Sequence, residues 1–182
     1  MTPSEPRSDR ERFEALYRDH HLAVLRFARR RTDPASAEEI VGETFAVAWR
    51  RLDRVPAQPL PWLLLVARKA LANQRRAAAR ADDKARRAAT GGAASSPDPA
   101  EALAERDAFM RAFVRLAERD REALRLVAWD GLSLADAARV AGTTRVAFAT
   151  RVHRARRRLA AALDEQSDRG HPSPQPRLES SP

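Results

Sequence analysis

Residues 133–159, SLADAARVAGTTRVAFATRVHRARRRL, predict a helix-turn-helix and thereby indicate the fold of this part of the chain. Ser133 can cap a first helix, because its hydroxyl can accept a hydrogen bond from the backbone N–H three residues later. Gly142 permits the tight turn that follows. The next helix is capped by Thr143 or Thr144 and is rich in arginine, which indicates a surface for a polyanion such as DNA.

The second helix of the pair is amphipathic. At 3.6 residues per turn, an apolar stripe that can pack on the first helix is formed by Phe148, Val152, Ala155 and Leu159. The opposite strip, which can enter a major groove, holds Val146, Thr150, His153, Arg154 and Arg157. The arginines that flank this strip and can contact phosphates are Arg145, Arg151, Arg156 and Arg158. A solvated arginine-rich surface helix is the alternative interpretation, but the spacing of the small and hydrophobic residues favours the helix-turn-helix.

Composition is compatible with a nucleic-acid partner but does not identify one. The length of 182 residues suits one large or two small domains. The formal net charge of +9 favours polyanionic partners. The excess of arginine over lysine can reflect the base composition of the source genome, so it is not counted as functional. The chain has no cysteine, which excludes disulfides and thiolate metal sites, and we expect no cofactor and no bound metal.

No segment indicates a membrane protein. The most apolar run, residues 62–67, is far too short to cross a bilayer. The polar residues 1–12 lack the apolar centre of a signal peptide. We therefore expect a cytoplasmic protein that does not insert into a membrane.

The apolar periodicity divides the chain into two helical blocks, so we expect an all-α fold of two small helical domains joined by a flexible linker. The first block covers residues 10–81 and the second residues 100–164. Residues 82–99, rich in Gly, Ser and Pro towards their end, form the predicted linker. The polar ends, residues 1–9 and 165–182, are expected to be disordered.

The first block is predicted to contain three helices. Asp33 and Pro34 suit the cap and the first turn of the second helix. Residues 53–61 contain three prolines and are expected to form a stiff loop, with the third helix beginning at Pro61. The residues predicted to be buried in this block are Phe13, Leu16, Tyr17, Val24, Leu25, Val41, Phe45, Ala48, Trp49, Leu52, Trp62, Leu63, Val66, Ala70 and Leu71. In the first helix of the second block they are Leu103, Met110, Phe113 and Leu116.

Four stretches together resemble the extracytoplasmic-function (ECF) group of bacterial sigma factors, which belongs to the sigma-70 family. Residues 37–49, AEEIVGETFAVAW, and residues 62–76, WLLLVARKALANQRR, resemble sigma region 2. Residues 130–135, DGLSLA, and residues 151–159, RVHRARRRL, resemble sigma region 4. The resemblance covers most of residues 13–163 in the order and spacing of the family.

The resemblance implies a protein that makes and breaks no bonds itself and is therefore not an enzyme. Members of the group bind core RNA polymerase, direct it to promoter DNA and help to melt that DNA. They are often held inactive by an anti-sigma factor, so such a protein is also an implied partner. The implied function is transcription initiation at promoters with a minus-ten and a minus-thirty-five element.

The resemblance also assigns roles to single residues. The helix of residues 38–49 is expected to dock on the clamp helices of the polymerase, with contacts from Glu39, Glu43 and Arg50. The loop of residues 54–60 and the helix after it match the parts that capture a flipped base and meet the duplex, so the expected minus-ten contacts are Arg54, Gln58, Lys69, Asn73, Arg75 and Arg76. The expected minus-thirty-five contacts are Arg145, Thr150, Arg151, His153, Arg154, Arg157 and Arg158.

Three positions depart from the family pattern. Gly42 stands where Gln is usual, Lys69 where Asn is common, and Ala149 where a basic residue is usual. Gly42 also weakens a helix interior by about 1 kcal/mol relative to Ala.

Two other classes of function explain less of the sequence. A conventional helix-turn-helix regulator that acts without polymerase explains residues 133–159, but not the series of Trp49, the proline loop, Trp62 and Asn73. An enzyme is disfavoured because the four histidines form no compact set and no nucleophile motif or Gly-rich phosphate loop appears. Promoter melting that depends on polymerase distinguishes a sigma factor from a regulator that binds duplex DNA alone.

Overall fold

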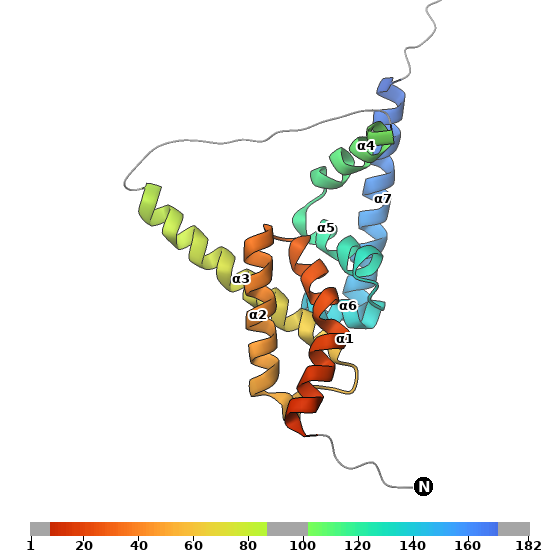
Figure 1. Ribbon diagram of the computed structural model, residues 1–182. Coiled ribbons are helices and arrows are strands. Elements are labelled where there is room, and N and C mark those ends of the chain that lie inside the picture. The colour runs from red at the N-terminus through yellow and green to blue at the C-terminus, as the bar shows by residue number, and fades with distance from the viewer. Residues whose placement is uncertain (1–7, 87–101, 171–182) are drawn as a thin grey trace, which may run out of the picture.

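The computed structural model describes residues 8–86 and 102–170, and within these ranges it contains helices and turns but no strand (Figure 1). The expected all-α class is confirmed. In chain order the elements are α1 (Asp9–Arg29), α2 (Pro34–Arg50), the 3-10 turn η1 (Leu52–Arg54), α3 (Pro59–Arg86), α4 (Ala102–Arg115), α5 (Glu118–Leu124), the π-helical turn η2 (Arg125–Trp129), α6 (Leu134–Ala141) and α7 (Arg145–Gly170).

Helices α1, α2 and α3 form the first block. Side-chain caps fix where the first two begin: the Ser8 hydroxyl accepts from the backbone N–H of Glu11 at 3.3 Å, and Asp33 accepts from the backbone N–H of Ser36 at 3.0 Å. The hydrogen bonds from Ser36 lower the pKa of Asp33. Asp33 is therefore an anion at neutral pH, placed beside the N-terminal dipole of α2.

The second block is built around the predicted helix-turn-helix, α6 and α7. The hydroxyl of Ser133 accepts from the backbone N–H of Asp136 at 3.1 Å, and that of Thr144 accepts from the backbone N–H of Ala147 at 3.2 Å. Gly142 ends α6 in the left-handed conformation, with φ of 69°. The expected capping at Ser133, the turn at Gly142 and the cap at Thr144 are confirmed.

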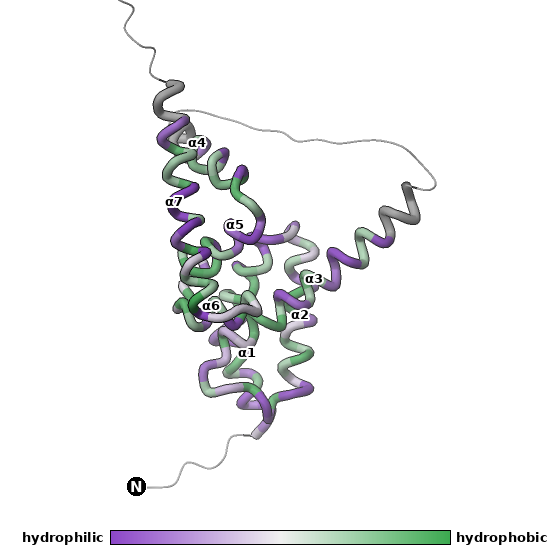
Figure 2. Tube along the Cα trace, turned by 180° about the vertical axis from the view of Figure 1, so that it is seen from behind, coloured by the Kyte–Doolittle hydropathy of each residue, from purple (hydrophilic) through white to green (hydrophobic). Residues whose placement is uncertain are grey.

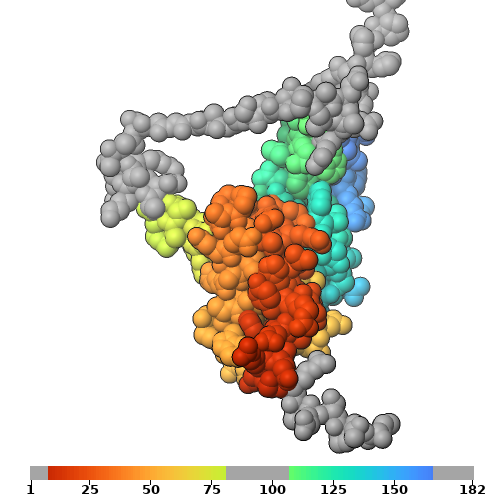
Figure 3. Space-filling model, in the orientation of Figure 1, coloured from red at the N-terminus to blue at the C-terminus, as the bar shows by residue number. Residues whose placement is uncertain are grey.

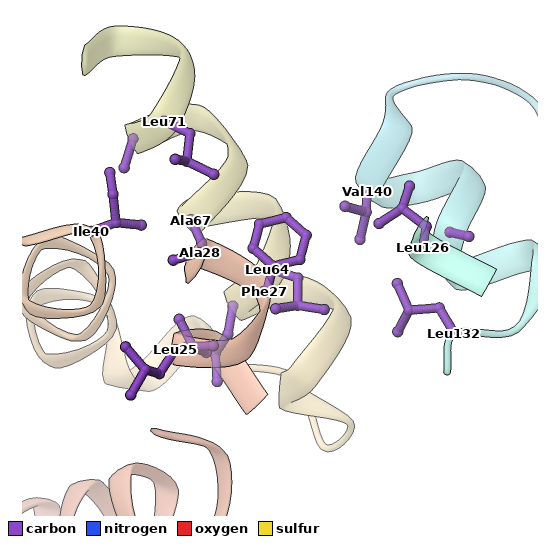
Figure 4. Packing of buried hydrophobic residues seen from close by; sticks show 14 of the residues in the cluster. Leu25, Phe27, Ala28, Ile40, Leu64, Ala67, Leu71, Leu126, Leu132 and Val140 are labelled. Atoms are coloured by element: carbon purple, nitrogen blue, oxygen red, sulfur yellow. The ribbon is translucent and has the colours of Figure 1, made fainter. Parts of the chain in front are cut away.

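The core extends through both blocks. Phe27 and Leu64 of the first block face Leu126, Leu132 and Val140 of the second (Figure 4). Helix α3 lies against α6 in both the front and back views (Figures 1 and 2), and the space-filling view shows the two blocks in contact (Figure 3). The burial of shared apolar surface therefore favours docking of the blocks onto each other.

Several predicted core residues are on the surface instead. Trp49 is 50% exposed, with its ring edge-on to Phe13 at 5.1 Å, and Tyr17 is 41% exposed and stacks on His21 at 4.9 Å. Met110 is 45% exposed, while Phe13, Trp62 and Val66 are half-buried. Most of the predicted set is buried as expected, and the interior also contains residues outside that set, among them Phe27, Ala28, Ile40, Leu64 and Ala67. Three helices in contact enclose a narrow space, and the small alanines allow the helix backbones to approach there.

Two helices are longer than expected. Helix α3 begins at Pro59 rather than Pro61, because the first-turn N–H groups have no intrahelical partner and prolines at the first and third positions therefore cost no hydrogen bond. It then continues through residues 82–86 of the predicted linker, and α7 continues through residues 165–170 of the predicted disordered tail. The remaining parts of the predicted linker and ends fall in residues 1–7, 87–101 and 171–182, outside the described residues.

None of the helices in the described ranges is both long enough and apolar enough to cross a membrane.

Gly42, within α2, and Gly142, at the end of α6, give a matched stability test. A Cβ added at Gly42, which is exposed within α2, would meet no other atom within 4 Å, whereas Gly142 requires a positive φ. We expect Gly42→Ala to raise the free energy of unfolding by about 1 kcal/mol through helix propensity. We expect Gly142→Ala to lower it by about 1–2 kcal/mol through strain in the left-handed conformation. Urea denaturation followed by circular dichroism measures both, and a destabilising Gly42→Ala would contradict this account of α2.

Candidate nucleic-acid interface

Helix α7 presents one face to the core and the opposite face to solvent. Phe148, Val152 and Ala155 are buried against the rest of the second block, as predicted, and Leu159 is half-buried. The outward strip consists of the exposed residues Val146, Thr150, His153, Arg154 and Arg157. Figure 2 shows hydrophilic positions along the length of α7. The buried stripe therefore fixes the helix, and the strip is free to meet a groove.

The outward strip can contact base edges through more than one kind of group. Val146 is 78% exposed in the first turn of α7, and an apolar side chain there can contact a thymine methyl. The hydroxyl of Thr150 donates to the carbonyl of Val146 at 3.0 Å, which leaves its lone pairs to accept from a base. Arg154 and His153 supply hydrogen-bond donors. Val146 was placed on the strip by periodicity but was not among the predicted contacts.

The flanking arginines of α7 have different surroundings. Arg145 and Arg156 are exposed, and no ion pair joins them to an acidic residue in the described part of the chain. Arg158 instead donates to the carboxylate of Asp120, whose side chain is only 8% exposed. Arg158 thus neutralises a buried carboxylate of its own block, a role with no signal in the sequence.

The predicted minus-ten residues fall into two groups. Arg54 and Gln58 are exposed just before α3, where the short loop of residues 55–58 joins η1 to the helix. Lys69, Asn73 and Arg76 follow at spacings of four and three, so they share one face of α3. The helical rise places Lys69 about 15 Å along α3 from its first residue, Pro59. The structure therefore places one group at the start of α3 and the other at its middle.

Two arginines of the second minus-ten group make hydrogen bonds within the first block. Arg76 donates to the side-chain oxygen of Asn73 at 2.5 Å. Arg75 donates to the backbone carbonyl of Arg31 at 3.0 Å, and Lys69 is exposed. These three cations have no carboxylate partner in the described ranges, which leaves their charge available to a phosphate.

The predicted polymerase contacts lie on one side of α2. Glu39, Glu43 and Arg50 are exposed and follow spacings of four and seven. Glu39 accepts from the amide of Gln74 at 3.4 Å. Glu39 and Glu43 also line a groove of about 350 Å³ between α2 and α3, together with Asn73. The tertiary structure thus brings two predicted polymerase contacts beside a predicted minus-ten contact.

A buried ionic cluster joins the two blocks. The side chain of Arg31, at the end of α1, is 3% exposed, and that of Asp130, after η2, is 2% exposed. Their Nη2 and Oδ2 atoms are 2.7 Å apart, and Glu122 of α5 lies 3.1 Å from the Nε of Arg31. Arg30 also donates to Asp130. From the sequence, Asp130 is predicted only to end a helix, because no local sequence pattern indicates a partner that is 99 positions away.

Helix α3 makes a further polar contact with the helix-turn-helix. Arg68 donates to the backbone carbonyl of Val140 at 3.1 Å, near the end of α6. With the buried cluster around Arg31, this bond sets how the basic side of α3 faces the second block.

The fold and the outward strip define the class: an all-helical protein of two blocks, the second of which is a helix-turn-helix of the DNA-binding kind. Comparison with known proteins gives the family. Residues 16–81 match sigma-70 region 2, and residues 106–159 match sigma-70 region 4. The chain belongs to the sigma-70 family and is a sigma factor of the ECF group.

Relatives and solved structures agree with this assignment. The ECF RNA polymerase sigma factor SigL of Mycobacterium tuberculosis is 30% identical over 156 residues, covering 83% of this chain and 88% of SigL. The RNA polymerase sigma factor NccH of Alcaligenes xylosoxydans xylosoxydans is 30% identical over 164 residues, covering 85% and 88%.

Two solved complexes contain chains of similar structure. In the complex of the sigma factor RpoE with the anti-sigma factor NepR from Bartonella quintana, the matched chain has a TM-score of 0.62 and 27% identity, covering 83% of this chain and 98% of that one. In the complex of CnrH with the cytosolic domain of CnrY, the TM-score is 0.57 and the identity 25%, covering 84% and 88%.

The buried cluster gives a test of how the blocks are held together. Asp130→Asn removes the shared anion of Arg30 and Arg31, while Glu122 still neutralises Arg31 in part. We expect the free energy of unfolding to fall by roughly 3 kcal/mol, the lower end of the range for breaking a buried pair. Urea denaturation measures the change.

The control is Glu14→Gln, which breaks an exposed pair with Arg10 inside α1. Its expected effect is below about 0.5 kcal/mol. Equal, small effects of the two substitutions would show that the buried cluster does not hold the blocks together.

Proposed function

We propose that this sigma factor binds core RNA polymerase, recognises minus-ten and minus-thirty-five promoter elements, and promotes melting of promoter DNA. The observation that carries the proposal is the exposed strip of α7, held on a buried apolar stripe, in a chain that also contains region 2. A conventional regulator needs no region 2, so the joint match favours the sigma factor over that alternative. Such a protein acts in the cytoplasm, where the polymerase transcribes.

For the minus-thirty-five element, α7 enters the major groove with its outward strip. Thr150, His153 and Arg154 contact base edges, and Val146 contacts a thymine methyl where one is present. The phosphate contacts beside the groove come from Arg145, Arg151, Arg156, Arg157 and Arg158. Arg158 contributes less than the others, because its guanidinium also pairs with Asp120.

For the minus-ten element, the loop before α3 captures an unstacked base. Arg54 and Gln58 lie at this loop, and its short length between η1 and α3 limits the conformational entropy lost on binding. Lys69, Asn73, Arg75 and Arg76 contact the duplex at the edge of the melted region. The group before α3 and the group at the middle of α3 therefore serve different parts of the same element: the first meets single-stranded bases and the second meets the duplex.

For the polymerase, α2 docks through the face that carries Glu39, Glu43 and Arg50. These side chains are exposed, so a partner can reach them. Gly42 lies between them and presents no side chain, which leaves the contact to its neighbours.

An anti-sigma factor is a further proposed partner, because the RpoE and CnrH chains were both solved in complexes, one of them with a protein described as an anti-sigma factor. The exposed apolar side chains of both blocks offer surface for it, among them Tyr17 and Trp49 in the first block and Met110, Val114 and Trp129 in the second. The protein's role is regulatory, and the proposal includes no catalysis.

Reconstituted transcription tests the proposed function. We expect the chain to co-purify with a cognate core polymerase and to give promoter-specific transcripts from genomic DNA. Permanganate should then detect unpaired thymines near the minus-ten element only when polymerase and the chain are both present. Binding to duplex promoters without any complex with polymerase would contradict the proposal and favour a conventional regulator.

Arg154 and Arg156 give a matched pair for base and phosphate contacts, because both are exposed on α7 and only Arg154 lies on the outward strip. We expect Arg154→Ala to cost about 1–3 kcal/mol on a specific promoter and much less on random DNA. We expect Arg156→Ala to weaken binding to both by the same small factor and to reduce the salt dependence. Fluorescence anisotropy of polymerase holoenzyme on the two DNAs measures this, and an identical loss for both variants would make Arg154 a phosphate contact.

A further inference from the structure

A cavity of about 710 Å³ lies between the two blocks. One wall is α3 with the end of α1, and the other is formed by α5, the turn of the helix-turn-helix and the start of α7. Its volume is typical of sites that enclose a small molecule. Thr150, His153 and Arg154 do not line it, so the cavity is separate from the outward strip of α7.

The lining of this cavity is strongly cationic. It contains seven basic side chains and two carboxylates, which leaves a formal charge of +5; the basic residues are Arg31, Arg68, Lys69, Arg75, Arg76, Arg119 and Arg151. Like charges around one cavity repel each other across a short distance, so an anion placed among them lowers the electrostatic energy.

Both carboxylates of the lining are already neutralised. Glu122 pairs with Arg31 at 3.1 Å. Glu118 pairs with Arg121 at 2.5 Å and with Arg125 at 3.1 Å, and neither of these arginines lines the cavity. Burial raises the pKa of Glu118, but the hydrogen bonds and charges of the two arginines together bring it below its ordinary value. Glu118 is therefore ionised at neutral pH and engaged by arginines outside the lining, while Glu122 is engaged by Arg31.

The remaining cations lack an anion. No ion pair connects Lys69, Arg119 or Arg151 to an acidic group in the described part of the chain. Arg75 and Arg76 donate to neutral oxygens only, the carbonyl of Arg31 and the amide of Asn73. Arg68 likewise donates only to a neutral oxygen, the carbonyl of Val140. Six cations from three helices thus line one cavity without a carboxylate partner in the described part of the chain.

We propose that this cavity binds a small polyphosphate anion, a phosphate chain either free or carried by a nucleotide, which bridges α3 to α5 and α7. The planar guanidinium group of arginine matches the geometry of a phosphate and can donate two hydrogen bonds to it. Several cations at separate positions favour several linked phosphates over a single one. A DNA duplex is disfavoured as the occupant, because the cations face each other from two walls.

The bound anion stabilises the docked arrangement of the blocks, because it contacts both of them. A ligand that binds only this arrangement shifts the equilibrium towards it in proportion to its concentration over its Kd. Lys69, Arg75, Arg76 and Arg151 are also proposed promoter contacts, so the anion competes with DNA for them. The site itself does not rest on the proposed function, because binding of the anion requires neither DNA nor polymerase.

Arg119 is the residue that tests the site separately. It lines the cavity from α5, is exposed, and belongs to none of the proposed DNA or polymerase contacts. Arg111 of α4 is an exposed arginine outside the lining and serves as the matched control. Both are changed to Gln in the full chain, and circular dichroism checks that each variant folds.

Isothermal titration calorimetry measures the binding of inorganic tripolyphosphate and, separately, of ATP, at a constant ionic strength of about 0.15 M. We expect one site per chain, a Kd weakened about tenfold by Arg119→Gln, and a Kd unchanged by Arg111→Gln. Equal affinity for the two probes identifies the phosphate chain as the recognised group, and tighter binding of ATP adds a contact to the nucleoside. The proposal is wrong if neither probe binds, if several ions bind per chain, or if the two variants weaken binding equally. None of these results depends on transcription, so the proposed function stands or falls on its own tests.

Discussion

The buried guanidinium of Arg31 sets how the two blocks dock. The side chain of Arg31 is 3% exposed, and burying its charge costs free energy unless the charge is paired. Both of its carboxylate partners, Glu122 and Asp130, come from the second block. Its ring contact with Phe27 and its bond to the Phe27 carbonyl fix it within the first block. The charge and the hydrogen-bond donors of Arg31 are therefore all paired only when the blocks meet in this orientation. The same orientation places α3 against α6.

Docking in this way has an electrostatic consequence. The face of α3 that carries its basic residues turns towards the second block, whose own surface there includes Arg119 and Arg151. The apolar contacts of Phe27 and Leu64 with the second block offset part of the resulting repulsion. The same residues of α3 are the proposed contacts for duplex DNA. In the docked arrangement these cations are therefore shared between the proposed cavity anion and the proposed DNA contacts.

Helix α7 satisfies two requirements with one period of 3.6 residues. Its buried stripe of Phe148, Val152 and Ala155 anchors it, while its outward strip remains exposed along the same turns. Arg158 adds an ionic contact to the buried Asp120, so the last part of the arginine series supports the block instead of serving DNA alone. A recognition helix has to be held rigidly to discriminate bases, and this packing supplies that rigidity.

The sequence alone determined the features that arise from short-range bonds and periodicity. Caps at Asp33, Ser133 and Thr144 are formed by atoms three residues apart, and the outward strip of α7 follows from helical spacing. Only the tertiary structure decided that Trp49 is exposed, that Arg158 pairs with Asp120, and that Arg31 pairs with Asp130. It also decided that basic residues of both blocks line one cavity. Helical spacing tells which residues share a face of a helix, but what that face packs against depends on how helices far apart in the chain are arranged. Each arginine could also pair with any of many carboxylates, and the sequence does not say which one lies beside it.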